Sequence, residues 1–360
     1  MSLNEPIEQK PEELRETLAL WLKLDVIGVE RIGGGRNSQV YKVKALRYGG
    51  PLELALKIYF RHAHDTRDRL ATEFGAFRFL WNNGIHDLPE PHDSAAGLGW
   101  AVYQFIEGEK IPPGQATSSD VTTAAGFLGS LRKVSAVPES RELGAASEAC
   151  FSPSKIVENV AQRFARLHLN LDDSISEHLA AHKFINEEFT PLYEQVITWN
   201  QKFLEQAGVS FDEDLHWSQR TLSPSDFGFH NALKQPDGRI IFLDFEYFGW
   251  DDPAKMISDF LLHPAMELTP SVRRTFAAEI FRNFADLPQL RTRVEAVYPL
   301  FGLKWCLIFL NEFLPDSLMR RQFAAVAPAE RSTLQRQQLE KSRRMLDNVR
   351  REYQNFPYRD

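Results

Sequence analysis

Cysteine is scarce in this sequence of 360 residues, which contains only Cys150 and Cys306. Two widely separated cysteines provide neither a disulfide framework nor the clustered spacing of a structural zinc site. This usage is typical of a reducing compartment, and we therefore expect a cytoplasmic protein.

A long uninterrupted hydrophobic run is also missing. The most apolar segment, VYPLFGLKWCLIFLNEFL, contains Lys304, Asn311 and Glu312. It is too short and too interrupted to cross a bilayer, so we interpret it as a buried helix. The first residues, MSLNEPIEQKPEELRE, are polar and acidic and do not resemble a signal peptide. We expect no membrane partner.

Basic residues are not in excess. There are 42 Lys and Arg against 49 Asp and Glu, which gives a formal net charge of -7. Nucleic acids are bound chiefly through an excess of Lys and Arg, so this balance argues against a nucleic-acid partner. The sequence carries no indication of an oligomeric state.

The composition that remains is that of an ordinary globular protein, with 43% hydrophobic and 25% charged residues. The length suggests about two domains. The first part predicts a helix over 11–24, then three antiparallel strands in VIGVERI, SQVYKVKAL and LELALKIYF. A helix over 65–82 and a strand in LGWAVYQFI complete a β-rich region.

The remainder of the chain is mainly helical. Helices are predicted over 119–135, 154–167, 187–206 and 329–353, and a small hairpin over 232–245 interrupts them. The Gly- and Pro-rich segment 108–118 is the best candidate for a linker. We therefore predict an α+β, two-lobe protein, with a small antiparallel β lobe over 1–107 and a larger, mainly helical lobe over 119–360.

The stretch ERIGGGRNSQVYKV contains three consecutive glycines, Gly33, Gly34 and Gly35. Glycines let backbone amides approach a phosphate closely, and Asn37 and Ser38 could add side-chain donors. A plain hairpin turn is an equally good interpretation of this motif alone. A strand rather than a helix follows, which excludes a dinucleotide-binding loop.

Lys57 lies in the middle of the apolar strand LALKIYF, where an unpaired ammonium group would be costly. Glu73, on the next predicted helix, could pair with it as in kinases, where such a lysine also contacts the nucleotide phosphates. The alternatives are a lysine that extends to solvent and a glutamate that is simply exposed.

The most specific motif is LSPSDFGFHNALK, in which Asp226 and Asn231 have the D-x-x-x-x-N spacing of a kinase catalytic loop. Asp226 would accept the proton of the substrate hydroxyl, and Asn231 would bind Mg²⁺. Asp244, at the end of RIIFLD, would be the second metal ligand. The alternative is that these residues only stabilise turns. All of these residues together, in this order, favour a nucleotide and metal site.

From about Gly33 to Asp259 the sequence resembles the aminoglycoside phosphotransferase and choline kinase family. The family motifs H-G-D-x-x-x-x-N and D-[WF]-E appear as Pro224-Ser225-Asp226 through Asn231, and as Asp244-Phe245-Glu246. The resemblance implies a protein-kinase-like fold. It also implies that the backbone of Gln104, Phe105 and Ile106 binds the adenine.

Two positions depart from the family pattern. Pro224 replaces the usual His of the catalytic loop, and Met256 replaces an Asp, whose bracing role Asp259 could take over. The resemblance implies an ATP- and Mg²⁺-dependent enzyme that phosphorylates a hydroxyl group of a small molecule, such as an amino sugar, an aminoglycoside or an amino alcohol like choline. GTP in place of ATP is an open alternative, as is a nucleotide-binding pseudokinase or scaffold.

The acceptor site is the least defined. The short interval between Asp244 and Asp251, without an A-P-E motif, leaves no room for the peptide-docking segment of a protein kinase. Acidic residues near aromatic ones could bind an ammonium group, and Asp251 and Glu312 are the candidates. The alternative is that the aromatic residues of LKWCLIFLNEF belong to the core.

Overall fold

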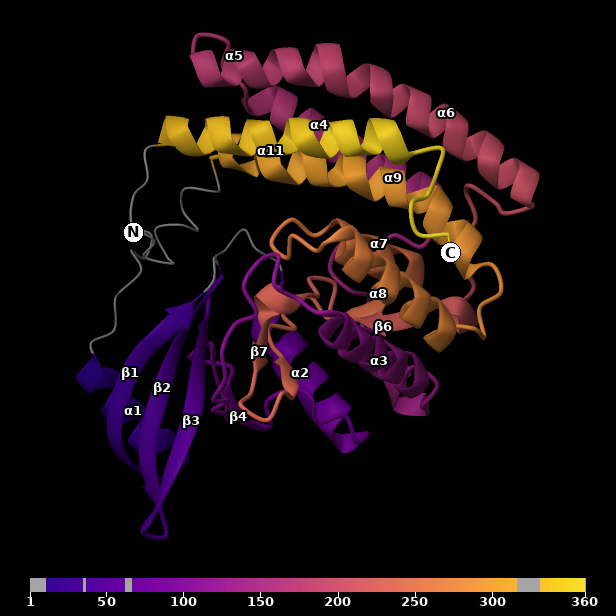
Figure 1. Cartoon of the computed structure of the whole chain (residues 1–360). Coiled ribbons are helices and arrows are strands. Elements are labelled where there is room, and N and C mark those ends of the chain that lie inside the picture. Colours follow the sequence, from indigo (N-terminus) through magenta and orange to yellow (C-terminus); the bar gives the residue numbers. More distant parts are fainter. Residues whose placement is uncertain (1–10, 35–36, 62–66, 316–330, 360) are drawn as a thin grey trace. The chain divides into compact units, whose positions relative to one another are not determined.

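The structure is a computed structural model that describes residues 11–34, 37–61, 67–315 and 331–359. The chain divides into two compact units. Within the described residues, the first unit consists of 11–110 and 231–247, and the second consists of 111–230, 248–315 and 331–359. Figure 1 labels most of their helices and strands. The boundary at 110 falls inside the predicted linker.

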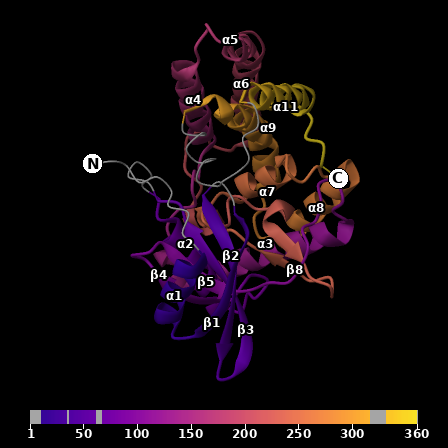
Figure 2. The ribbon, with the colours of Figure 1, turned by 90° about the vertical axis from the view of Figure 1, so that its left-hand side faces the viewer.

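The first unit is built on a five-stranded sheet with the order β1-β2-β3-β5-β4, antiparallel throughout (Figure 2). Its elements are α1 (Pro11–Leu22), β1 (Asp25–Gly34), β2 (Ser38–Arg47), β3 (Gly50–Tyr59), β4 (Pro91–Ala95) and β5 (Trp100–Gln104). The predicted helix and strands are confirmed, and β4 is an additional short strand. The sheet confirms the small antiparallel β lobe.

One face of this sheet is covered by α1. Leu14 and Leu18 of the helix are fully buried in a cluster with Val43, Leu54 and Trp100 of the sheet. The spacing of four between the two leucines places them on the same side of the helix. Their burial against alternate strand residues supplies the core of this unit.

The hairpin of β7 (Ala232–Lys234) and β8 (Ile240–Phe242) belongs to the first unit rather than to the helical one. The Phe242 N–H donates to the Asp87 carbonyl at 2.8 Å, and the Phe245 ring lies 5.1 Å from that of Phe77 in helix α2 (Arg69–Asn82). The sequence assigned this segment to the C-terminal lobe. Its contacts, made far from it along the chain, place it with the N-terminal strands.

The second unit is mainly helical, as predicted. Its helices are α3 (Ser118–Val134), α4 (Pro153–Asn170), α5 (Ser176–Lys183), α6 (Thr190–Ala207), α7 (Pro253–Leu262), α8 (Pro270–Asn283), α9 (Leu290–Phe309) and α11 (Arg331–Glu352). Capping explains where several begin. The side chains of Ser152, Asp252 and Thr269 each accept a backbone N–H of the first turn, and each is followed by a proline.

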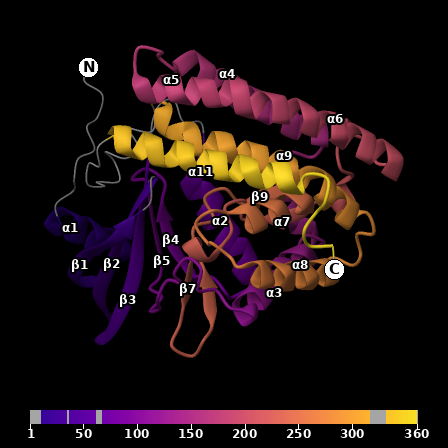
Figure 3. The same ribbon diagram turned by 45° about the horizontal axis from the view of Figure 1, so that its top comes forward.

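Helix α9 forms the centre of this unit. The expectation that this segment is too short to cross a bilayer was wrong, because the helical stretch Leu290–Phe313 has 24 residues and is apolar enough; 78% of its most apolar window is nevertheless buried inside the protein. Helix α11 runs beside it (Figure 3), and the Ser342 hydroxyl of α11 donates to the Cys306 carbonyl of α9 at 2.9 Å. A Cβ atom at Gly302 would collide with Val349, so glycine permits this close approach. The prediction of a buried helix is confirmed.

A two-stranded ribbon within the second unit holds the segment before the D-x-x-x-x-N motif. Strand β6 (Thr221–Ser223) pairs with β9 (Gly249–Asp251) in antiparallel register. Trp250 anchors this ribbon, because its indole N–H donates to the Ser140 carbonyl at 2.8 Å. Both strands have three residues, which is too short for a periodic pattern to be recognised in the sequence.

Candidate active site

Lys57, in the first unit, contacts two carboxylates at once. Its Nζ atom lies 2.6 Å from Glu73 Oε2 and 2.6 Å from Asp244 Oδ1. Lys57 is 7% exposed and Glu73 is 2% exposed. A lysine this buried requires anionic partners, and the strand, the helix and the hairpin each contribute one member of the cluster.

Two tyrosines support the buried glutamate. The Tyr59 hydroxyl lies 2.9 Å from Glu73 Oε2, and it also lies 2.6 Å from the Tyr103 hydroxyl. Strand alternation explains this arrangement, because Lys57 and Tyr59 are two positions apart on β3 and therefore lie on the same face. The sequence analysis did not single out either tyrosine.

The cluster contains three carboxylates and two cations, because Arg69 Nε lies 3.7 Å from Glu246 Oε1. Burial lowers the pKa of Lys57, but Asp244, Glu73 and Glu246 outweigh this effect and raise it above its usual value, so the lysine stays protonated. Burial raises the pKa of Glu73 to about 7, although Lys57 opposes the shift. Because Glu73 is only partly ionised at neutral pH, the two cations and the three carboxylates nearly balance.

The oxygen atoms near Asp244 fit a hard divalent cation. Asn37 Nδ2 donates to Glu246 Oε1 at 2.6 Å and to the Tyr247 hydroxyl at 2.7 Å. Within the described part of the chain, Glu246 Oε2 and Asn37 Oδ1 are buried without a hydrogen-bond partner. Carboxylate and amide oxygens are the ligands that Mg²⁺ prefers. The sequence analysis quoted Glu246 only as part of a motif and did not select it as a ligand.

The glycine-rich segment is only partly described. Gly33 and Gly34 end β1, while Gly35 lies outside the described residues. A Cβ atom at Gly34 would lie 2.6 Å from the Ser38 carbonyl oxygen, so the close approach of β1 to β2 requires glycine there. Ser38 is buried, and the Asn37 amide is directed to Glu246. Their expected contact with phosphate stays a prediction.

The segment expected to bind adenine follows directly from β5. The Gln104 N–H donates to the Glu90 carbonyl at 2.8 Å, so this amide is already used within the protein. Phe105 is half-buried and Ile106 is buried. The adenine contact of these residues stays a prediction. The Gln104 N–H cannot contribute to it, because that group already donates to Glu90.

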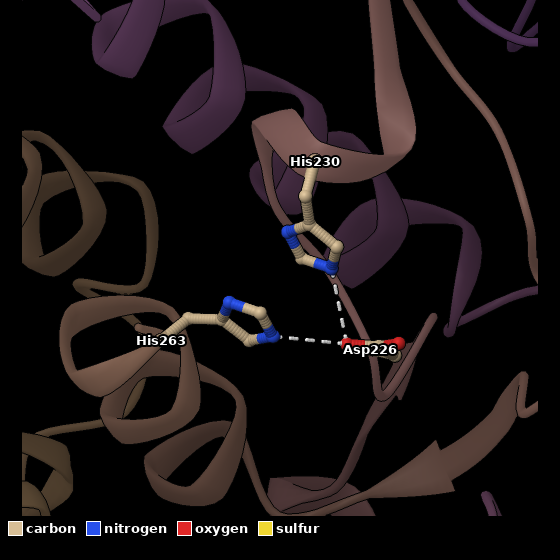
Figure 4. A group of neighbouring side chains, drawn as sticks. All are labelled: Asp226, His230 and His263. Atoms are coloured by element: carbon tan, nitrogen blue, oxygen red, sulfur yellow. Dashed lines mark hydrogen bonds and ion pairs between the residues drawn. The ribbon is translucent and has the colours of Figure 1, made fainter. Parts of the chain in front are cut away.

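Asp226, in the second unit, is presented by a tight turn after β6. Its N–H donates to the Pro224 carbonyl at 2.9 Å, and Ser225 adopts a left-handed φ of 68°. Figure 4 shows two imidazoles converging on its carboxylate: His230 Nε2 lies 3.1 Å and His263 Nε2 lies 3.2 Å from Oδ1. The Asp226 side chain is 42% exposed, which leaves it accessible to a substrate.

The histidines set the charge of this carboxylate. Burial raises the pKa of Asp226, but the hydrogen bonds from His230 and His263 outweigh it and hold the pKa well below its usual range. Asp226 is therefore ionised at neutral pH. His263 lies 37 positions beyond Asp226 in the sequence, outside any motif spacing, and the sequence analysis missed it.

Asn231 ends a single 3₁₀ turn, Phe229–Asn231, and begins the hairpin. Its carbonyl accepts the Leu243 N–H at 2.8 Å, which ties it to the residue before Asp244. The two predicted metal ligands, Asn231 and Asp244, are thus held at the base of one hairpin in the first unit. Asp226 belongs to the second unit.

The structure does not support Asp251 and Glu312 as acceptor contacts. Asp251 is fully buried, and its Oδ2 atom pairs with Lys255 Nζ at 2.7 Å. Glu312 is 6% exposed, within the interior of the helical unit. The sequence offered one signal for Asp251: Lys255 lies four positions further on, and an acidic residue is rarely buried unless it is paired.

Lys255 supports the turn that precedes Asp226. Its Nζ donates to the Ser225 hydroxyl at 3.1 Å and lies 3.3 Å from Asp259 Oδ2. Burial lowers the pKa of Lys255, but Asp251 and Asp259 outweigh it and raise the pKa, so the ammonium form persists. Asp259 thus braces the turn of Asp226 through Lys255, while Met256 is buried in the core.

The chain resembles known proteins in its sequence pattern and in its fold. The model of the phosphotransferase enzyme family matches residues 28–296. No curated protein sequence matches the chain. Spectinomycin phosphotransferase in complex with ADP and spectinomycin is similar, with 14% identity, a TM-score of 0.60 and coverage of 92% of this chain and 99% of that one.

Two further solved structures resemble the chain. Choline kinase LicA from Streptococcus pneumoniae has 14% identity and a TM-score of 0.57, and the match covers 94% of this chain and 98% of that one. A Plasmodium vivax ethanolamine kinase has 11% identity and a TM-score of 0.56, and the match covers 94% and 89%. At these identities the likeness shows the fold, which confirms the predicted protein-kinase-like α+β architecture.

Proposed function

The chain belongs to the phosphotransferase enzyme family, and from this premise we propose that it transfers the γ-phosphoryl group of ATP to a hydroxyl group of a small molecule. The observation that carries this proposal is the contact of buried Lys57 with both Glu73 and Asp244. In kinases, a lysine such as Lys57 contacts the nucleotide phosphates, and a carboxylate such as Asp244 binds the metal ion.

Asp226 would accept the proton of the acceptor hydroxyl. The acceptor oxygen forms a bond to the γ-phosphorus, while the bond from that phosphorus to the β–γ bridging oxygen breaks. Because the low pKa of Asp226 makes it a weak base, its main contribution is to orient the hydroxyl, and the proton moves once the new bond forms. This suits phosphoryl transfer, in which positioning and charge stabilisation dominate.

Mg²⁺ would neutralise charge on the phosphates when bound. Asp244, with Asn231 and Glu246, would hold the ion in the first unit, and Lys57 would contact the phosphates. The Asp244 carboxylate, held by Lys57, and the unpartnered Glu246 Oε2 support this assignment.

The acceptor is proposed only by class, as an amino sugar, an aminoglycoside or an amino alcohol. Related structures are named for spectinomycin, choline and ethanolamine as their substrates. A panel of these compounds, with ADP release as the assay, would identify the acceptor.

Asp226→Asn and Asp244→Asn test the proposed roles and should fail in different ways. Asp226→Asn should reduce kcat by about 10²- to 10⁴-fold, the usual contribution of a general base, while ATP still binds. Asp244→Asn should lose the stabilisation by ATP and Mg²⁺ in thermal-shift measurements. Activity is measured as ADP release over the acceptor panel.

Matched carboxylate substitutions serve as controls. Asp212→Asn, on an exposed loop of the second unit, and Asp93→Asn, on exposed strand β4, should leave activity and nucleotide binding unchanged. Full turnover in Asp226→Asn would contradict the assignment. ATP binding by the wild-type chain without transfer to any acceptor, and without hydrolysis, would favour a pseudokinase instead.

A further inference from the structure

The segment after helix α7, residues 263–266, contacts the loop of Asp226 at two points. The sulfur of Met266 accepts the Phe229 N–H at 3.4 Å, and His263 Nε2 lies 3.2 Å from Asp226 Oδ1. Met266 is 2% exposed and His263 is 9% exposed. This segment is distant in sequence from the loop, and no motif of the sequence includes it.

The hydrogen bonds of His263 define its tautomer. The Ala265 N–H donates to His263 Nδ1 at 3.2 Å, so Nδ1 carries a lone pair. In a neutral imidazole the proton then lies on Nε2, the atom that faces Asp226. A doubly protonated ring would place an N–H against the Ala265 N–H. Burial also lowers the pKa of His263, which favours the same neutral form.

Aromatic neighbours fix the orientation of this ring. Trp305 packs edge-on against His263, with ring centroids 4.8 Å apart and planes at 81°. His230 stacks on the same ring, with centroids 3.9 Å apart and an interplanar angle of 7°. The Trp305 indole N–H donates to Asp259 Oδ1 at 3.3 Å, which holds Trp305 in turn. Rotation of the His263 ring would break these contacts.

His230 joins His263 on the same oxygen of Asp226. Its Nε2 atom lies 3.1 Å from Oδ1, and the other carboxylate oxygen points away from both rings (Figure 4). Gly228 makes room for this arrangement. A Cβ atom there would lie 2.7 Å from Met266 Sδ and 2.8 Å from His230 Nδ1.

Two imidazoles and a carboxylate are also a ligand set for a transition metal, and these three residues are close enough to hold one. A ligating nitrogen must offer a lone pair toward the ion. His263 offers an N–H there instead, because its Nδ1 atom accepts the Ala265 N–H. The geometry therefore describes hydrogen-bond donors to Asp226 rather than a metal centre.

We propose that His263 is a positioning residue for Asp226: its Nε2–H donates to Oδ1 and fixes the plane in which the carboxylate meets the acceptor hydroxyl. This inference rests on the proposed function of Asp226. The turn after α7 would thus take part in the reaction indirectly, because it orients Asp226 and does not touch the substrate.

His263→Phe and His263→Gln separate this role from simple packing. Phe keeps a ring between Trp305 and His230 but has no N–H, so kcat should fall about 10- to 100-fold, as expected for a misplaced catalytic group. The KM for ATP should change less than about twofold, because uniform binding is unaffected. Gln, which retains an N–H donor, should restore most of the lost kcat. The assay is ADP release from ATP and Mg²⁺ with water as the acceptor.

His178→Phe is the matched control, because His178 is a buried histidine of the same unit, 6% exposed and packed 5.4 Å from Phe313. It should alter thermal stability and leave kcat unchanged. Unchanged kcat in His263→Phe, with Asp226→Asn inactive, would overturn the role of His263 alone. Equal losses in the Phe and Gln variants would also overturn it. A wild-type chain without any phosphoryl transfer would reject the proposed function as well.

A measurement on the wild-type chain avoids any folding defect of the variants. Long-range ¹H–¹⁵N spectra of histidine-labelled protein should show the proton of His263 on Nε2 and a lone pair on Nδ1. A proton on Nδ1 would overturn the proposal, whatever the activity.

Discussion

The backbone beside the two principal carboxylates is held in an uncommon conformation. Ser225, next to Asp226, has φ 68°, and Asp244 itself has φ 65°. Left-handed conformations of residues other than glycine are costly and persist where the surroundings enforce them, often at functional sites. Here Lys255 holds the Ser225 hydroxyl, and Lys57 holds the Asp244 carboxylate.

Glu148 provides a residue-scale prediction. Its carboxylate pairs with Lys304 at 2.9 Å and with Arg163. Burial raises the pKa of Glu148, but the two cations outweigh it and lower the pKa to about 2, against an ordinary 4.5. The stabilisation is therefore complete above about pH 4.5 and is lost as the pH falls toward 2. Glu148→Gln should lower the free energy of unfolding at pH 7 by about 1–2 kcal/mol, a value reduced for solvent screening.

Urea unfolding at several pH values measures this effect. The difference between wild type and Glu148→Gln should shrink as the pH decreases from 4.5 to 2. Glu158→Gln, at an exposed position of α4, should stay within about 0.5 kcal/mol of wild type. A difference that does not change with pH would show that the ion pairs do not determine the pKa of Glu148.

At the scale of elements, the ribbon of β6 and β9 determines where Asp226 lies. Strand β9 passes so close to residues 144–146 that a Cβ atom at Gly249 would lie 2.5 Å from the Gly144 oxygen and the Ala146 nitrogen. These are backbone atoms, which cannot move away as a flexible side chain could. The ribbon therefore depends on glycine at this position.

Gly249→Ala should destabilise the protein by about 1–3 kcal/mol, the usual cost of overpacking. It should also lower kcat, because β6 leads directly into the turn of Asp226. Gly144→Ala is the control, since a Cβ atom there would meet nothing within 4 Å. Thermal unfolding and ADP release measure the two effects. Equal stability of both variants would contradict the close approach.

At the scale of the whole molecule, the first unit is discontinuous in sequence. The chain leaves it after residue 110 and returns at Asn231 with the hairpin that carries Asp244. The boundary at 230/231 lies within the D-x-x-x-x-N motif itself. The two polar ends of this motif therefore belong to different compact units.

Phe245→Ala tests whether the hairpin stabilises the strands of the N-terminal unit. Phe245 is fully buried and contacts Phe77, so its truncation should cost about 3–5 kcal/mol. Hydrogen exchange should increase in β1–β5 and α2, while α9 and α11 stay protected. Phe301→Ala, in the core of α9, is the matched variant and should have the reverse pattern. Increased exchange confined to the helices in Phe245→Ala would contradict the division into units.

The sequence by itself determined the elements and their class. Period-two and helical hydrophobic patterns, with glycine and proline turns, located β1–β3, α3, α4, α9 and α11, because these signals are local in the chain. The spacing of Asp226 and Asn231, with Asp244 after an apolar strand, indicated the family for the same reason. The expected pairing of Lys57 with Glu73 is also present in the structure.

Only the tertiary structure decided which distant residues meet. It also buried Asp251, which pairs with Lys255 four positions further on, although the sequence suggested an acceptor contact. It placed the hairpin with the first unit, and it brought His263 to Asp226. Hydrogen bonds and burial depend on distances in space, and residues 37 positions apart leave no periodic signal of their contact.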